Sequence, residues 1–113
     1  MASYKEIDTL EQWKQLLDAS HDHQVVIFKH STTCPVSANA LSEFEHYLDA
    51  HPDNATTYAL VKVIESRPVS NQIAEDTGVK HESPQIILLQ GGKKYWTASH
   101  WSITQEHMKA VMQ

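Results

Sequence analysis

Residues 25–37 read VVIFKHSTTCPVS, and this stretch decides the fold. It begins with four apolar residues, Val25 to Phe28, which are typical of a strand buried on both faces. It ends with Cys34, Pro35 and two further residues, and proline is favoured in the first turn of a helix. The stretch therefore predicts a strand-to-helix junction with a thiol at the helix N-terminus, where negative charge is stabilised.

Cys34 is the only cysteine among the 113 residues, so it cannot form a disulfide within its own chain. A lone cysteine excludes a disulfide framework and is typical of a reducing compartment. The first residues carry no hydrophobic signal segment, and the longest apolar runs are too short to cross a membrane. We therefore expect a cytoplasmic protein without a membrane partner.

The charge pattern argues against nucleic-acid binding. The formal net charge is -5, Arg67 is the only arginine, and the lysines are scattered, whereas phosphate binding depends on clustered basic residues. The histidines include the group His21-Asp22-His23, but no second cluster has the spacing of metal ligands. The sequence therefore predicts neither a nucleic-acid partner nor a metal site.

Patterns on both sides of the junction predict alternating helices and strands. Thr9 to Gln12 resembles a capping box, Gly78 is a favoured helix end, and Gly91-Gly92 predicts a hairpin turn. The expected elements, in order, are a helix over residues 10–17, a strand over 25–28, a helix after Cys34 that ends before Pro52, a strand over 58–63, a helix from Pro68 to Gly78, strands over 85–90 and 93–98, and a last helix capped by Ser102-Ile103-Thr104-Gln105 that places Ile103, His107, Ala110 and Val111 near one face.

This order of elements, with Cys34 at the first strand-to-helix junction and Ser83-Pro84 before the penultimate strand, resembles the thioredoxin fold. The resemblance covers nearly the whole chain. It implies a single α/β thioredoxin-like domain over residues 1–113, with a central mixed four-stranded sheet flanked by about four helices. It also implies a cis peptide bond at Pro84, whereas the residues alone favour a trans proline at the start of a strand, because cis X-Pro bonds are rare.

The segment Cys34-Pro35-Val36-Ser37 resembles a redox C-x-x-C motif in which serine replaces the second cysteine. Its combination with Ser31-Thr32-Thr33, Gly78-Val79, Glu82-Ser83-Pro84-Gln85 and Ser99-His100-Trp101 is similar to the monothiol bacilliredoxin family of the bacillithiol system. The resemblance implies a monothiol thiol-disulfide oxidoreductase in which Cys34 removes bacillithiol from protein mixed disulfides.

The same resemblance implies the partners of the protein. They are bacillithiol-capped client proteins, together with bacillithiol as a thiol co-substrate or an external reductase that regenerates Cys34. We expect no permanently bound cofactor and a monomer.

Residues beside Cys34 supply the other candidate site residues. Hydroxyl groups and the first N–H groups of a helix stabilise a thiolate. The expected substrate-binding residues are Thr32, Thr33, Pro35, Val36, Ser37, Ser83 and Pro84. The residues expected to tune the thiol are His30, Lys29 and His100. As a cation His30 would favour the thiolate, although a surface side chain explains it equally well, and Lys29 is only an approximate counterpart of the lysine with which glutaredoxins bind glutathione.

Three other functions remain open at this stage. A glutaredoxin-like iron-sulfur cluster binding or carrier protein shares a cluster across a dimer, although the C-G-F-S pattern of such proteins is absent. Ser31-Thr32-Thr33-Cys34 faintly resembles the T-x-x-C motif of thiol peroxidases, without a second cysteine. An adaptor with an inert Cys34 is the third. Ser99-His100 replaces the glycine pair of glutaredoxins, which leaves room for a thiol other than glutathione.

Overall fold

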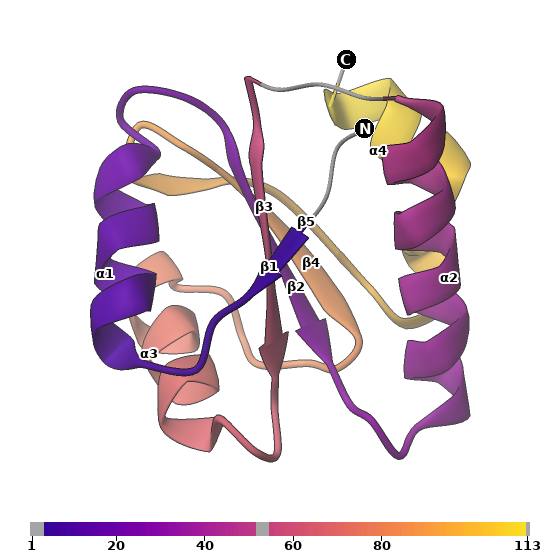
Figure 1. Cartoon of the computed structure of the whole chain (residues 1–113), viewed down its shortest axis with the longest axis horizontal. Coiled ribbons are helices and arrows are strands. Elements are labelled where there is room, and N and C mark those ends of the chain that lie inside the picture. The colour runs from indigo at the N-terminus through magenta and orange to yellow at the C-terminus, as the bar shows by residue number, and fades with distance from the viewer. Residues whose placement is uncertain (1–3, 52–54, 113) are drawn as a thin grey trace.

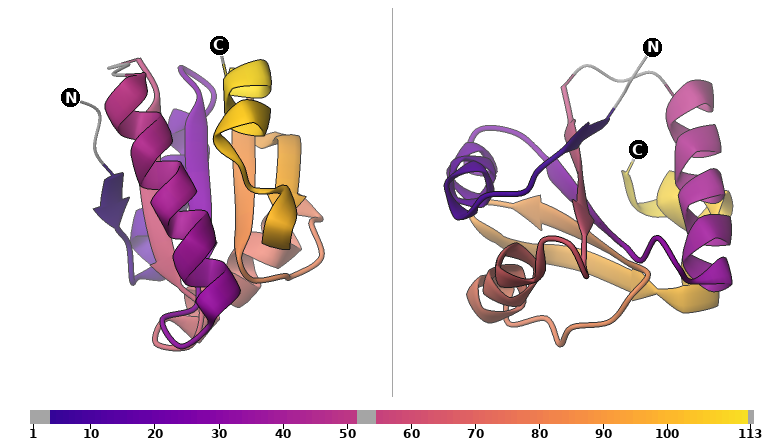
Figure 2. Two further views of the ribbon diagram at one scale, coloured as in Figure 1. Left: turned by 90° about the vertical axis from the view of Figure 1, so that its right-hand side faces the viewer. Right: turned by 60° about the horizontal axis from the view of Figure 1, so that its bottom comes forward.

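The structure is a computed structural model that describes residues 4–51 and 55–112; the remaining residues, Pro52 among them, lie outside the described part. The elements are β1 (Tyr4–Glu6), α1 (Leu10–Ala19), β2 (Val25–His30), α2 (Pro35–Ala50), β3 (Thr57–Lys62), α3 (Arg67–Thr77), β4 (Gln85–Gln90), β5 (Lys93–Ser99), the short 3-10 helix η1 (His100–Ser102) and α4 (Gln105–Met112). The strands form one mixed sheet in the order β1-β3-β2-β4-β5. Helices α1 and α3 cover one face of this sheet, and α2 and α4 cover the other (Figures 1 and 2).

The sheet has five strands, whereas the sequence predicted four. The additional strand is β1. Strand β1 has three residues and pairs in parallel with β3, with Tyr4 opposite Tyr58. Lys5 and Glu6 in this strand are exposed, so it carries no run of buried residues. A strand of this length is too short to show an alternating pattern, and its pairing is decided by β3.

Strand β2 is the central strand that the apolar run predicts. It pairs in parallel with β3 and antiparallel with β4. All six of its residues are buried, and the strand continues past Phe28 through Lys29 and His30. Its side chains alternate between two cores, so that Phe28 packs with Phe44 of α2 while Ile27 packs on the side of α1 and α3. A polar pair at the end of a central strand must therefore find partners inside the protein.

The helix boundaries follow the predicted signals closely. The capping box of Thr9 and Gln12 is present at the start of α1. Helix α2 begins at Pro35 and ends at Ala50, before Pro52. Gly78 ends α3 with φ 70°, the left-handed conformation that glycine adopts at low cost.

The last helix differs from the prediction. Residues 100–102 form η1, and α4 begins only at Gln105, where the Thr104 hydroxyl accepts a hydrogen bond from the His107 N–H at 3.2 Å. The buried side chains of α4 are Met108 and Met112, whereas His107 and Ala110 are exposed. Ile103 and Val111 pack against the core as predicted, whereas the prediction was wrong for His107 and Ala110, because η1 delays the start of α4 to Gln105.

Four segments meet at the end of the sheet where β2 ends, namely those that follow β2, β3 and β5 and the one that precedes β4. Strand β3 runs parallel to β2 and ends there, and the antiparallel β4 begins opposite Lys29 with Gln85. Gln85 is in turn paired with Ser99 at the end of β5. The loop from β2 to α2 lies at this edge, the lower one in Figure 1.

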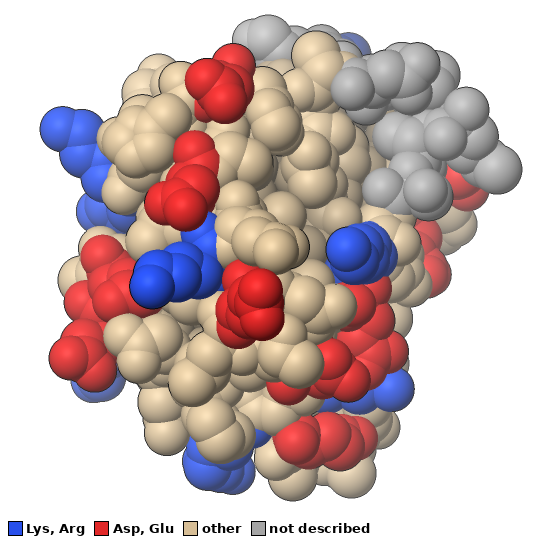
Figure 3. Space-filling view, turned by 60° about the vertical axis from the view of Figure 1, so that its left-hand side comes forward, with Lys and Arg blue, Asp and Glu red and all other residues tan. Residues whose placement is uncertain are grey.

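The surface mixes charges of both signs on the face shown in Figure 3, where Lys and Arg side chains alternate with Asp and Glu. Such a face lacks the continuous basic patch that phosphate binding needs. Within residues 4–51 and 55–112, no helix combines the length and the apolar character required to span a bilayer.

Candidate active site

Cys34 is the residue that precedes α2, a helix of 16 residues. It has an extended backbone with φ -104° and ψ 122°, and its carbonyl accepts the first helical hydrogen bond from Ala38 at 3.0 Å. The thiol is half-buried and makes no capping hydrogen bond of its own. The sulfur therefore lies at the N-terminal end of α2.

Ser37 faces the interior rather than the sulfur. Its side chain is fully buried, and its hydroxyl oxygen accepts a hydrogen bond from the Ser31 N–H at 2.9 Å. The same oxygen lies 2.7 Å from Nδ1 of His30. Burial lowers the pKa of His30 below its ordinary value, so its imidazole is neutral at pH 7 and Nδ1 can accept the hydroxyl proton. Ser37 thus fastens the start of the Cys34 loop to β2.

His30 is placed differently from the expected cation beside the thiol. It is buried at the end of β2 and is engaged by Ser37. Burial, with a smaller effect of Lys62, lowers the pKa of His30, and it outweighs Glu65 and Glu45, which raise this pKa. A neutral His30 contributes no positive charge to a thiolate, and its Nδ1 is instead hydrogen-bonded with the Ser37 hydroxyl.

The loop between β2 and α2 is exposed at Thr32, Thr33 and Pro35, and Val36 is half-buried. The Thr32 hydroxyl donates to Oε2 of Glu65 at 3.2 Å. This contact ties the Cys34 loop to the connection between β3 and α3. Glu65 was not among the residues singled out from the sequence, and nothing local in its surroundings could have identified it.

Ser83 and Pro84 directly precede β4, at the end of the sheet where the Cys34 loop leaves β2. The Ser83–Pro84 peptide bond is cis, as the resemblance implied. The antiparallel ladder of β2 and β4 ends with Lys29 opposite Gln85, the residue that directly follows Pro84. The Ser83 hydroxyl is buried and has no hydrogen-bond partner among the described residues. A buried hydroxyl without a partner is costly, which marks this point as a place where a bound group can donate or accept.

Glu82 connects the loop before β4 to the end of β5 and the start of η1. It accepts a hydrogen bond from the Ser99 hydroxyl at 2.9 Å, and its other oxygen lies 3.9 Å from Nδ1 of His100. The His100 N–H donates to the Pro84 carbonyl at 3.0 Å. His100 has φ 54°, a left-handed conformation that is uncommon outside glycine. Its neighbour Trp101 is 67% exposed.

Lys29 does not lie at the surface of this site. Its side chain is fully buried on the opposite face of the sheet, toward α3. Its ammonium donates to the Ser70 carbonyl at 3.0 Å and to Nδ1 of His81 at 3.3 Å. Burial lowers the pKa of Lys29 to about 8. A group in this position cannot bind the carboxylate of a surface ligand.

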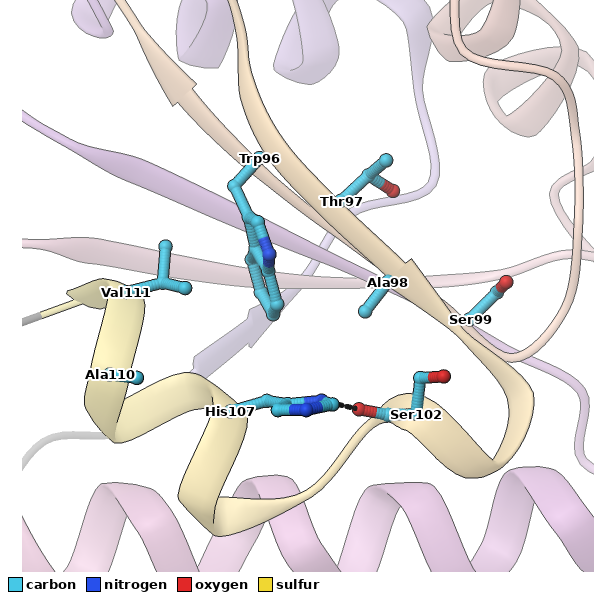
Figure 4. A pocket seen from close by; sticks show the side chains of 8 residues that line it. All are labelled: Trp96, Thr97, Ala98, Ser99, Ser102, His107, Ala110 and Val111. Atoms are coloured by element: carbon cyan, nitrogen blue, oxygen red, sulfur yellow. Dashed lines mark hydrogen bonds between the residues drawn. The ribbon is translucent and has the colours of Figure 1, made fainter.

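A hollow of about 430 Å³ lies on the far side of η1, between β5 and α4 (Figure 4). Trp96 projects into it from the strand and His107 faces it from the helix. The His107 ring donates to the Ser102 carbonyl at 2.7 Å, which fixes η1 against α4. The hollow is therefore bordered by the same turn that carries His100.

Comparison with known proteins agrees with this geometry. The family described as monothiol bacilliredoxin BrxC matches residues 5–108. A solved structure described as a candidate oxidoreductase with a thioredoxin fold is 31% identical at a TM-score of 0.84, covering 97% of this chain and 94% of that chain. Two thioredoxins share the fold: that of Malassezia sympodialis (Mala s 13) at 23% identity and TM-score 0.78, covering 99% and 90% of the two chains, and that of Fasciola hepatica at 13% and 0.74, covering 96% and 95%.

These findings confirm the expected thioredoxin-like fold and the expected enzyme class. The match to BrxC extends over nearly the whole chain and includes Cys34 and Ser83-Pro84. A single thiol at a helix N-terminus supplies the nucleophile that disulfide exchange requires. The protein is accordingly a thiol-disulfide oxidoreductase, and the chain belongs to the monothiol bacilliredoxin BrxC family.

Proposed function

We propose that the protein removes bacillithiol from client proteins through Cys34. The Cys34 thiolate attacks the bacillithiol sulfur of the client mixed disulfide. A new disulfide forms between Cys34 and bacillithiol, and the client sulfur leaves as a thiolate. The observation that carries this proposal is the lone thiol of Cys34, half-exposed at the start of α2.

The second half of the cycle needs an external thiol. A second bacillithiol, or the thiolate of a reductase, attacks the Cys34 mixed disulfide and restores the Cys34 thiolate. The two electrons that reduce the client therefore come from this second thiol. Because bacillithiol acts as a co-substrate, the protein needs no permanently bound cofactor, and we place the cycle in the cytoplasm, where thiols stay reduced.

Ser37 supports a monothiol cycle. A thiol at this position could attack the Cys34 mixed disulfide and close an internal disulfide before the second thiol arrives. The serine hydroxyl cannot do so, and it is already engaged by Ser31 and His30. The mixed disulfide on Cys34 therefore persists until an external thiol resolves it.

We place docking of the client on three segments at the end of the sheet where the Cys34 loop leaves β2. They are Thr32 with Glu65, Ser83, and His100 with Trp101. We place the capped client against Ser83, whose hydroxyl offers a hydrogen bond that the folded protein leaves unused. A monomer suffices because all these groups come from one chain.

The test is a direct transfer reaction. A client protein capped with bacillithiol is incubated with the reduced protein, and intact masses of both are followed. The expected result is loss of the cap from the client and gain of the same mass on Cys34. The Cys34→Ala variant provides the control and should transfer nothing.

A matched client capped with glutathione tests the choice of thiol. Faster removal of bacillithiol than of glutathione supports the proposal. Equal rates would assign the protein to general disulfide exchange. A client that keeps its bacillithiol cap while Cys34 remains open to alkylation would refute the proposed function.

A further inference from the structure

The ammonium group of Lys29 lies in a largely apolar layer of the protein. The buried residues that pack on this face of the sheet include Ile27 and Val61, which neighbour Lys29 along β2 and across to β3. A charged group in such a layer costs free energy unless hydrogen bonds compensate for its lost hydration. Its two acceptors are the Ser70 carbonyl, on α3, and Nδ1 of His81, on the connection between α3 and β4.

The contact with His81 fixes the state of the imidazole. A lysine ammonium can only donate, so Nδ1 of His81 accepts and the ring proton is on Nε2. The Ser70 hydroxyl lies 3.3 Å from the same Nδ1. Burial, Lys29 and Arg67 lower the pKa of His81, and Glu82 opposes them. The ring therefore stays neutral at pH 7 and keeps its acceptor turned toward Lys29.

Three consecutive residues of the loop between α3 and β4 form hydrogen bonds with three different parts of the protein. The Lys80 carbonyl accepts a hydrogen bond from the Gln85 side chain at 3.0 Å. His81 is held by Lys29, and Glu82 is held by Ser99 on the far side of β4. Ser83 and Pro84 come directly after these three anchors, so their position depends on all of them.

We propose that Lys29 is a positioning residue, which acts through His81 to hold the loop that presents Ser83 and Pro84 to the client. This inference rests on the proposed docking of the client at Ser83. It explains why a costly buried cation occupies a strand position that any apolar side chain could fill. Lys29 touches neither the sulfur nor the client, and its influence passes through the loop.

The hydrogen bond between Lys29 and His81 is lost as the pH falls. Protonation of His81 removes the acceptor and places two cations next to each other, with Arg67 nearby and only Glu82 to offset them. The loop is therefore held above the pKa of His81 and released as the pH falls through it. Client transfer should weaken on the acid side faster than the reactivity of Cys34 itself.

The test compares two variants of the exposed residue His81. In His81→Asn, the amide oxygen takes the place of Nδ1 and still accepts from Lys29, but it does not titrate. In His81→Leu, the acceptor is lost. We expect His81→Leu to lower kcat/KM for a capped peptide by about tenfold, mainly through KM, and His81→Asn to restore it. On the acid side, the transfer rate of His81→Asn should fall only as much as the alkylation rate of Cys34 falls.

Two further measurements separate positioning from other effects. Alkylation of Cys34 by iodoacetamide should proceed at the same rate in both His81 variants, because the thiol is untouched. Hydrogen exchange of the amides in residues 79–85 should speed up in His81→Leu and in Lys29→Met but not in His81→Asn. Equal exchange and equal kcat/KM in all variants would overturn the proposal.

The exchange measurement requires no turnover. If the wild-type protein removes no cap from any peptide, the proposed function fails, and the contrast in loop exchange still decides whether Lys29 holds the loop. If the contrast in exchange is absent while transfer proceeds normally, the positioning role fails alone.

Discussion

At the scale of single residues, Ser37 shows how a motif position acquires a role that its motif does not suggest. In the sequence it occupies the place of a second redox cysteine. In the structure its hydroxyl joins the Ser31 N–H to Nδ1 of His30, and the sulfur of Cys34 is not among its partners. Ser37 therefore holds the loop that carries Cys34 in place, in addition to being unable to form a disulfide with Cys34.

Replacing Ser37 with alanine tests this role. The change leaves the part-buried Ser31 N–H and the buried His30 ring without their common partner, so we expect a loss of about 2 kcal/mol in unfolding free energy. Urea denaturation measures it. Ser31→Ala is the matched control, because the bond uses the Ser31 main chain, and it should cost little. Equal losses in the two variants would show that the Ser37 hydroxyl is not what holds the loop.

At the scale of elements, the β4–β5 hairpin is fastened to the end of α1. The N–H groups of Gly91 and Gly92 donate to the Ser20 carbonyl at 2.8 Å and to the Ser20 hydroxyl at 2.9 Å. Both glycines have positive φ, 63° and 78°. A side chain at Gly91 would meet open space, whereas one at Gly92 would meet the His21 ring at 2.5 Å.

The two glycines therefore form a matched pair of substitutions. Gly91→Ala should cost about 1 kcal/mol, from the left-handed backbone alone. Gly92→Ala should cost about 1 kcal/mol more, because the His21 ring must also move. Thermal or urea unfolding of both variants measures the difference. Adding His21→Ala should remove the excess at Gly92, and an excess that persists would mean that His21 is not its cause.

At the scale of the whole molecule, buried ionisable groups shape the dependence of stability on pH. The pKa of Lys29 is about 8 in the folded state against an ordinary 10.5, because burial disfavours the charged form. Between these values the unfolded chain binds more protons, so stability rises with pH. Tyr4 acts in the opposite direction, because burial and Glu45 raise its pKa from 10.0 to about 12. Between those values the folded state binds more protons, and stability falls.

We therefore expect stability to rise by about 2 to 3 kcal/mol between pH 8 and pH 10, and to fall above pH 10. Urea unfolding at pH 7, 8, 9, 10 and 11 tests the curve. Lys29→Met should abolish the rise and be more stable than the wild type at pH 7 by about 2 kcal/mol. A rise of the same size in Lys29→Met would exclude Lys29 as its source.

The thioredoxin-like order of elements could be predicted because its signals are local. The apolar run before Cys34, the proline after it, the capping box at Thr9 and the turn at Gly91-Gly92 each act within a few residues. The three residues of β1 carried no such signal, and the start of α4 was misplaced because the turn at His100 has no sequence pattern of its own.

What the sequence by itself determined is where the thiol lies: at the junction of a central strand and a helix, without a second cysteine. Only the tertiary structure decided what the neighbouring polar side chains face. Lys29 and His81 are 52 residues apart, and Thr32 and Glu65 are 33 apart. Such contacts follow from strand register and helix packing, which many distant residues set together. The sulfur could be located from local patterns because its place depends on one junction, whereas its surroundings depend on the whole sheet.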